Sequence, residues 1–174
     1  MATARVLVVD DDSTLLDVVS RVLTRAGYEV LPANGAHQAL EIVSNHHPYV
    51  DLVVSDLEMP AMQGTQLVRE VAQISPQTAG LLMTGGILEP ADVPNGVPVL
   101  QKPFAMSDLI SAVEATLARS AQLSADFRRT CERSGELRQQ SRKLLSEAVE
   151  ARRRSRDLRK NCGNQNPSNR GGWR

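Results

Sequence analysis

Charged and polar side chains stand directly after several short apolar runs of this chain, where they could take part in chemistry. Residues 10–12 are three consecutive aspartates that follow the apolar run 5–9, and Asp56 ends another run. Thr84 and Lys102 stand at the ends of two later runs. Carboxylates that lie close together disfavour each other's ionisation, so a cluster of them needs a positive partner.

A divalent cation and a phosphoryl group would together satisfy this set of side chains. Mg²⁺ prefers oxygen ligands and typically uses one or two carboxylates together with phosphate oxygens. A lysine ammonium and a threonine hydroxyl suit the other phosphoryl oxygens, and a carboxylate can act as a covalent nucleophile. These residue types therefore predict Mg²⁺-dependent phosphoryl transfer to an aspartate.

The apolar pattern of the first 118 residues predicts alternating strands and helices. Short aliphatic runs predict strands at residues 5–9, 29–33, 51–56, 79–84 and 97–101. Apolar residues at helical spacing predict helices from Ser13 to a stop at Gly27, and over 35–44, 65–73 and 106–118. Strands that alternate with helices form a parallel sheet covered on both faces, so the pattern predicts an α/β fold.

One segment of this pattern is irregular. Residues 85–98 should hold the helix between the last two strands, but they contain three prolines and three glycines. Proline removes a helical hydrogen bond and clashes with the preceding turn, so we expect a short, broken helix there or none. In open parallel sheets ligands bind at the carboxyl ends of the strands, which places the aspartates, Thr84 and Lys102 at one edge of the sheet.

Four motifs give the chain a resemblance to a known family. In chain order they are VLVVDDD (6–12), DLVVSDLEMPAMQG (51–64), LLMTGG (81–86) and LQKPF (100–104). Through them residues 5–118 resemble the receiver domain of bacterial two-component response regulators, the CheY-like fold. The resemblance implies a doubly wound, five-stranded parallel sheet of the flavodoxin-like type. It also implies a regulatory phospho-acceptor, rather than a turnover enzyme, whose phosphoryl donor is a histidine kinase or a histidine phosphotransfer protein.

The resemblance implies a role for each matching acid. Asp56 would be the phospho-acceptor and, with Asp11, a direct ligand of Mg²⁺. The backbone carbonyl of Glu58 would supply a third protein oxygen to the metal. Asp10 would act mainly through a metal-bound water, and Asp12 would have no part in the site.

The resemblance also assigns the residues that would face the phosphoryl group. Thr84 would bond it through its hydroxyl, and Lys102 would bond both the free carboxylate and the phosphoryl group. The peptide bond before Pro103 would be cis, and the Glu58 side chain and Gly86 would tune dephosphorylation. Two features depart from the family pattern: Val99 replaces the usual aromatic switch residue, and the interval between Thr84 and Lys102 is about one helical turn short.

The net charge of zero hides two oppositely charged parts of the chain. Residues 1–118 carry 5 basic and 14 acidic residues, whereas residues 119–174 carry 15 basic and 6 acidic ones, giving net charges of −9 and +9. We therefore expect a receiver domain at 1–118, a charged helical extension at 119–160 and a disordered tail at 161–174. The tail is rich in asparagine and glycine, a composition typical of disorder.

The charged extension shows a weak repeat with a period of seven. Small residues recur at Ser134, Ser141, Ala148 and Ser155, and leucine or alanine at Leu137, Leu144, Ala151 and Leu158. Four interpretations stay open for it: a solvated helix, a coiled coil that makes a homodimer, contact with nucleic acid through the basic segment 151–160, and folding back onto the acidic receiver.

Other properties of the sequence restrict its compartment and class. No apolar run reaches the roughly 18 residues that a membrane span needs, and the first residues lack the pattern of a signal peptide. The expectation is a cytoplasmic protein without membrane contact. Cys131 and Cys162 fit no metal-binding spacing and are expected to be free thiols.

Three rival functions deserve comparison with the phosphorelay interpretation. A phosphatase of the haloacid-dehalogenase type would need an aspartate two residues after the nucleophile, where this chain has Glu58. A receiver used only for docking, independently of phosphorylation, would not need the full set of acids with Thr84 and Lys102. A transcription regulator would bind nucleic acid through the basic helix.

Overall fold

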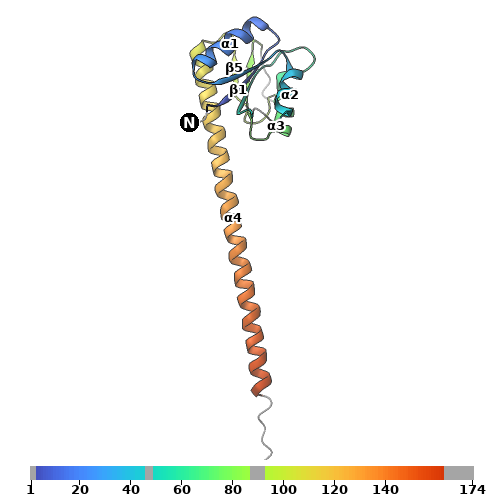
Figure 1. The fold of residues 1–174 in the computed structure, drawn as a ribbon, viewed down its shortest axis with the longest axis vertical. Coiled ribbons are helices and arrows are strands. Elements are labelled where there is room, and N and C mark those ends of the chain that lie inside the picture. The colour runs from blue at the N-terminus through green and yellow to red at the C-terminus, as the bar shows by residue number, and fades with distance from the viewer. Residues whose placement is uncertain (1–2, 46–48, 87–92, 163–174) are drawn as a thin grey trace, which may run out of the picture. The chain divides into compact units, whose positions relative to one another are not determined.

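The computed structural model describes residues 3–45, 49–86 and 93–162, which form an α/β domain and a long helix (Figure 1). The strands are β1 (Arg5–Val9), β2 (Glu29–Ala33), β3 (Leu52–Asp56), β4 (Ala79–Thr84) and β5 (Val99–Gln101). The helices are α1 (Ser13–Arg25), α2 (Ala36–Ser44), α3 (Gly64–Ile74) and α4 (Met106–Cys162). All neighbouring strands are parallel, in the order β2-β1-β3-β4-β5. The predicted doubly wound, five-stranded parallel sheet is therefore confirmed.

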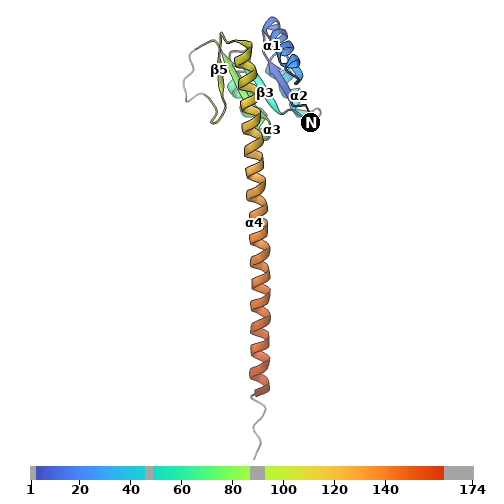
Figure 2. The same ribbon diagram turned by 90° about the vertical axis from the view of Figure 1, so that its left-hand side faces the viewer.

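Alternation along the strands divides the core into two layers. Val6 and Val8 of β1 point to one face of the sheet, where they pack with apolar residues of α1 and the first turns of α4. Leu7 and Val9 point to the other face, against α2 and α3. Figures 1 and 2 show these two helix pairs on opposite faces of the sheet. Because both faces are covered, the central strands are almost entirely aliphatic, as parallel sheets require.

The structure describes only part of the segment 85–98, for which a broken helix or none was predicted. Residues 87–92 lie outside the described part of the chain, and the described residues 93–98 form a turn with Gly96 at φ 82°, without helix. Strand β5 starts at Val99, two residues later than predicted. Pro98 has no N–H to donate to a ladder, although its carbonyl still accepts a hydrogen bond from the Leu82 N–H at 3.0 Å.

Asp12 and Gly27 explain where helix α1 begins and ends. The Asp12 carboxylate accepts hydrogen bonds from the N–H groups of Thr14 (2.8 Å) and Leu15 (3.4 Å), which satisfies donors that a helix N-terminus leaves free. At the other end Gly27 takes φ 97°, a conformation that glycine adopts without a Cβ penalty. Asp12 therefore turns away from the other two aspartates and belongs to the helix.

This cap should make part of the stability depend on pH. The two N–H bonds lower the pKa of Asp12 below its ordinary value of 3.8. Stability from a lowered pKa is present above the unfolded-state value and is lost as pH falls through the folded-state value. We expect the difference in melting temperature between wild type and Asp12→Ser, which keeps a cap without a charge, to shrink when the pH falls from 7 to 3. Glu41→Gln, an exposed acid on α2, should show no such change; equal pH profiles for wild type and Asp12→Ser would contradict the prediction.

The last helix contains both the predicted helix 106–118 and the predicted charged extension. Within the described residues α4 runs from Met106 to Cys162, and the chain divides into two compact units, Met1–Ala125 and Asp126–Arg174. The domain boundary at 118 stays a prediction, and the expected disordered tail lies almost wholly outside the described residues. No helix in the described part of the chain is long and apolar enough to cross a bilayer.

Candidate phosphoryl-acceptor site

The strand order brings the two acidic segments together. β1 lies between β2 and β3 in the sheet, so the chain leaves β1 toward one side and returns to β3 on its other side. The carboxyl ends of β1 and β3 therefore border the point where strand order reverses. Asp10 directly follows β1, and Asp56 is the last residue of β3. Ligands of open parallel sheets bind at such a point, because the loops diverge there and leave an opening.

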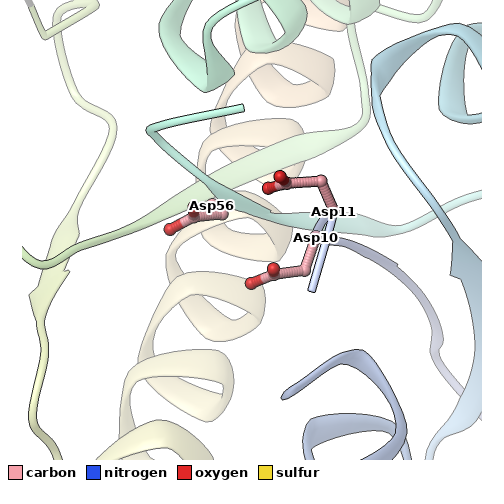
Figure 3. Close-up of side chains that lie close together, drawn as sticks. All are labelled: Asp10, Asp11 and Asp56. Carbon is pink, nitrogen blue, oxygen red and sulfur yellow. The ribbon is translucent and has the colours of Figure 1, made fainter. Parts of the chain in front are cut away.

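Three carboxylates meet at this opening. Asp10, Asp11 and Asp56 each offer an oxygen atom, and these atoms lie within 4.8 Å of one another. Figure 3 shows Asp10 and Asp11 entering from the end of β1 and Asp56 from the end of β3. Asp10 and Asp56 are buried, with exposed fractions of 1% and 7%, whereas Asp11 is exposed. The cluster is therefore anchored in the core on two sides and reachable by solvent through Asp11.

Lys102 supplies the positive charge to this cluster. Its Nζ lies 2.7 Å from Asp56 Oδ1 and 3.5 Å from Asp10 Oδ2. The backbone holds the lysine in place, because its N–H donates to the Thr84 carbonyl at 2.6 Å, and the peptide bond to Pro103 is cis, as the resemblance implied. A lysine directly after β5 thus reaches one acid directly after β1 and another at the end of β3.

Burial and neighbouring charges together shift the pKa values of Asp10 and Lys102. Burial raises the pKa of Asp10 above its ordinary value, although the Asp12 N–H and the Lys102 charge act in the opposite direction. Burial alone would lower the pKa of Lys102, but the hydrogen bond to Asp56 and the charges of both acids outweigh it and hold that pKa above its ordinary value. Lys102 is therefore charged at neutral pH, and the buried acids retain a demand for more positive charge.

Thr84 and Glu58 both lie close to Gly86. Thr84 is buried at the end of β4, and its Oγ1 accepts a hydrogen bond from the Gly86 N–H at 3.0 Å. This leaves the hydroxyl proton available to a ligand. A Cβ built on Gly86 would lie 2.7 Å from Glu58 Oε1 and 3.9 Å from Thr84 Oγ1. Glu58 itself is exposed, and its proposed carbonyl contact to a metal stays a prediction.

Ser55 and Gly64 lie against the backbone carbonyl of Asp56, and neither of them was given this role in the sequence analysis. The buried Ser55 donates its hydroxyl to the Asp56 carbonyl at 2.7 Å. Gly64 opens α3 so close to that carbonyl that a Cβ there would overlap its oxygen. A polar residue inside an apolar strand was the available signal for Ser55. Nothing in the local pattern could reveal the close approach at Gly64, which depends on how the loop folds back.

Val99 lies where the family usually has an aromatic switch residue. It is the first residue of β5 and is 38% exposed. Its Cα pairs with Leu82, whereas Thr84 pairs with Gln101 at the other end of the strand. Both departures noted in the sequence, Val99 and the short interval before it, therefore concern β5 and the segment leading to it, not the acidic cluster.

Comparison with known proteins gives the chain a family. The family profile of the response regulator receiver domain matches residues 6–114, more than half of the chain. The chain belongs to the receiver domain family. Receivers are regulatory phospho-acceptors of two-component systems, so the resemblance drawn from the four motifs is confirmed.

Relatives and solved structures match the receiver portion. The response regulator receiver protein CpdR of Brucella abortus is 30% identical over 65% of this chain and 96% of its own length. The transcriptional regulatory protein YrkP of Bacillus subtilis is 32% identical over 66% of this chain, and the chain spans only half of that relative. A receiver domain structure from Clostridium thermocellum has 31% identity and a TM-score of 0.60 over 69% of this chain and 98% of its own. Similarity to these proteins thus covers the receiver and leaves the charged extension aside.

Proposed function

We propose that this receiver accepts a phosphoryl group on Asp56 from the phosphohistidine of a histidine kinase or a histidine phosphotransfer protein, in a Mg²⁺-dependent reaction. The observation that supports the proposal best is the 2.7 Å contact between Lys102 Nζ and Asp56 Oδ1 inside a cluster of three carboxylates. A lysine paired only for structure would neutralise one acid. Here one ammonium faces two buried acids, and the third acid is open to solvent.

The transfer step conserves atoms and charge in a simple way. A carboxylate oxygen of Asp56 attacks the phosphorus, a new O–P bond forms, and the N–P bond of the phosphohistidine breaks. The leaving nitrogen keeps the electron pair of that bond. The imidazole leaves as a neutral ring because the other ring nitrogen of the phosphohistidine carries a proton. Lys102 remains beside the acceptor oxygen and can form an ion pair with the phosphoryl oxygens of the product.

The acidic cluster fits a hard divalent cation. Its donors are carboxylate oxygens, which Mg²⁺ prefers, and one of the acids remains accessible for a partly hydrated ion. Asp11 and Asp56 would bind the metal directly, Glu58 would contribute its backbone carbonyl, and Asp10 would act through water. When bound, Mg²⁺ offsets the repulsion between the carboxylates and the incoming phosphoryl oxygens.

Thr84 is placed to respond to the modification. Its hydroxyl oxygen accepts a hydrogen bond from the Gly86 N–H, which leaves the hydroxyl proton free to be donated to a ligand. Donation of this proton to a phosphoryl oxygen would tie the end of β4 to the modified Asp56. Val99 would follow that movement with less surface than an aromatic residue offers. The output would therefore be changed binding to a partner or changed self-association, in the cytoplasm.

Two alternatives are weaker on structural grounds. A docking-only receiver gives no reason to bury two acids with one lysine, because an unpaired buried charge is costly. The relative YrkP is named a transcriptional regulatory protein, but this chain spans only half the length of that protein. Nucleic-acid contact would have to come from the basic residues of α4.

The decisive experiment is chemical labelling of the purified full-length protein. After incubation with acetyl phosphate and Mg²⁺, intact-mass measurement should show one added phosphoryl group that hydroxylamine removes. Removing the metal with EDTA should reduce the labelled fraction at least about 100-fold, because the metal offsets charge at the reacting centre. Asp11→Asn should behave like the EDTA-treated protein, whereas Asp17→Asn, an exposed acid on α1, should label normally. Labelling that is equally fast with and without metal would rule out the proposed mechanism.

A further inference from the structure

The second compact unit carries exposed apolar side chains along one side of its helix. Phe127, Leu137 and Leu144 are 71%, 60% and 60% exposed, and Leu145 and Val149 are more than half exposed as well. Phe127 belongs to a row with Ser134, Ser141 and Ala148, each seven residues apart, and Leu137 and Leu144 belong to a second row with Thr130. The two rows are the a and d positions of a heptad repeat, the pattern of a helix that packs against another helix.

The unit has little to stabilise it as a single helix in water. Its described ion pairs are Arg129–Asp126 at 3.8 Å and Arg154–Glu150 at 3.9 Å, both long and highly exposed. Exposed pairs of this kind contribute little to stability. Helices in proteins gain most of their stability from the packing of an apolar face, because an isolated helix is only marginally stable in water. The exposed apolar side chains of the two rows therefore need a partner to pack against.

We propose that the partner is a second copy of this chain, bound as an antiparallel coiled coil with its two-fold axis near Gln139. In this register each leucine of the d row faces a small residue of the a row in the second copy. Leu144 lies opposite Ser134, and Leu137 opposite Ser141. A parallel pair would instead stack serine on serine at both a positions, leaving the seam loosely packed and polar at those layers.

The charges beside the two rows favour the same arrangement. In an antiparallel pair the g positions of the two helices face each other, whereas in a parallel pair each g position faces an e position. The g positions hold Asp126, Arg133, Gln140, Glu147 and Arg154. With the axis near Gln139, Arg133 faces Glu147 of the second copy and Asp126 faces Arg154 of the second copy. The two-fold axis doubles each of these contacts.

Other arrangements lose this complementarity. In the parallel pair Glu147 would face Arg152 of the second copy, but Arg133 would face Arg138, and this repulsion on both sides of the dimer offsets that attraction. Shifting the antiparallel pair by one heptad brings Asp126 against Glu147 in one direction and Arg133 against Arg154 in the other. The proposed register has one unfavourable contact of this type, between Arg138 and its own copy at the e position. Charge therefore selects both the orientation and the register.

A charge reversal separates the two orientations by the sign of its effect. Arg133→Glu turns two attractions into repulsions in the antiparallel dimer, so we expect the dissociation constant of the full-length protein to rise about tenfold. In a parallel dimer the same change would create attraction to Arg138 and tighten the complex. Arg133→Glu combined with Glu147→Arg should restore the wild-type constant. Arg142→Glu, the same charge change on the outer face, should leave it unaltered.

Sedimentation velocity over a concentration series measures these constants, and a distance measurement tests the orientation directly. A spin label at Arg128→Cys, in a background of Cys131→Ser and Cys162→Ser, should lie about 33 Å along the axis from its copy, since the two sites are about 22 residues apart at 1.5 Å per residue. A parallel dimer would place the labels within about 20 Å. Monomers at every concentration, tighter binding by Arg133→Glu, or the short distance would each overturn the proposal.

Discussion

Asp56→Asn is expected to take up no phosphoryl group from acetyl phosphate, with labelling at least about 100-fold below wild type because a neutral amide is not a nucleophile of comparable strength. The amide keeps the shape of the side chain, so the fold should persist and the loss should be chemical. Lys102 retains Asp10 as a partner at 3.5 Å, which limits the disturbance of the site. Intact-mass measurement of the labelled fraction over time provides the test.

Asp51→Asn is the matched control for this variant. Asp51 stands at the opposite end of the same strand, where its carboxylate accepts a hydrogen bond from the Arg5 N–H at 2.8 Å. The change is chemically identical but lies at the amino edge of the sheet, so labelling should match wild type. Modification that survives in Asp56→Asn, on Asp10 or Asp11, would refute the assignment of the acceptor.

Gly64→Ala is expected to destabilise the protein by about 3 kcal/mol, the upper part of the range for overpacking a closed site. The added Cβ would overlap the Asp56 carbonyl oxygen, and it would also lie 3.0 Å from Ser55 Oγ. The carbonyl belongs to the backbone of a buried central strand, so it has little room to yield. A chain of this size should lose on the order of 10 °C in melting temperature.

The control for Gly64→Ala is the same substitution at Gly85, which has open space where a Cβ would lie. A Cβ on Gly85 would have no neighbour within 4 Å, so Gly85→Ala should stay within about 0.5 kcal/mol of wild type. Thermal unfolding of the two variants measures the difference. Because the clash is with the residue that carries the acceptor carboxylate, Gly64→Ala should also label more slowly at temperatures where it remains folded. Wild-type stability and labelling in Gly64→Ala would show that the loop relaxes.

Most of the fold was predictable because its signals are local. Each central strand is a continuous aliphatic run, and each helix of the receiver has an apolar stripe with a recognisable start or stop, as at Asp12 and Gly27. Alternation of the two element types then leaves a parallel sheet as the arrangement that buries all the runs. The start of β5 was misplaced by two residues because Pro98 is apolar yet cannot donate a ladder hydrogen bond.

The residues of the candidate site were predictable from the sequence, but the different environments of the three consecutive aspartates were not. The order of residue types along the chain placed acids, a hydroxyl and an amine at strand ends, and four motifs with a family resemblance supplied the roles. Consecutive aspartates look alike in a sequence, yet they point in different directions from the turn after β1. Asp10 is buried, Asp11 is exposed, and Asp12 caps α1.

By itself, the sequence determined the α/β fold, the set of polar residues at the carboxyl edge and the opposite charges of the two parts of the chain, because periodicity and composition are properties of short segments. Only the tertiary structure decided that Lys102 also reaches Asp10, and that Gly64 must lack a side chain. These contacts join residues on different strands and loops. Their geometry depends on strand order and loop closure, which no local pattern encodes.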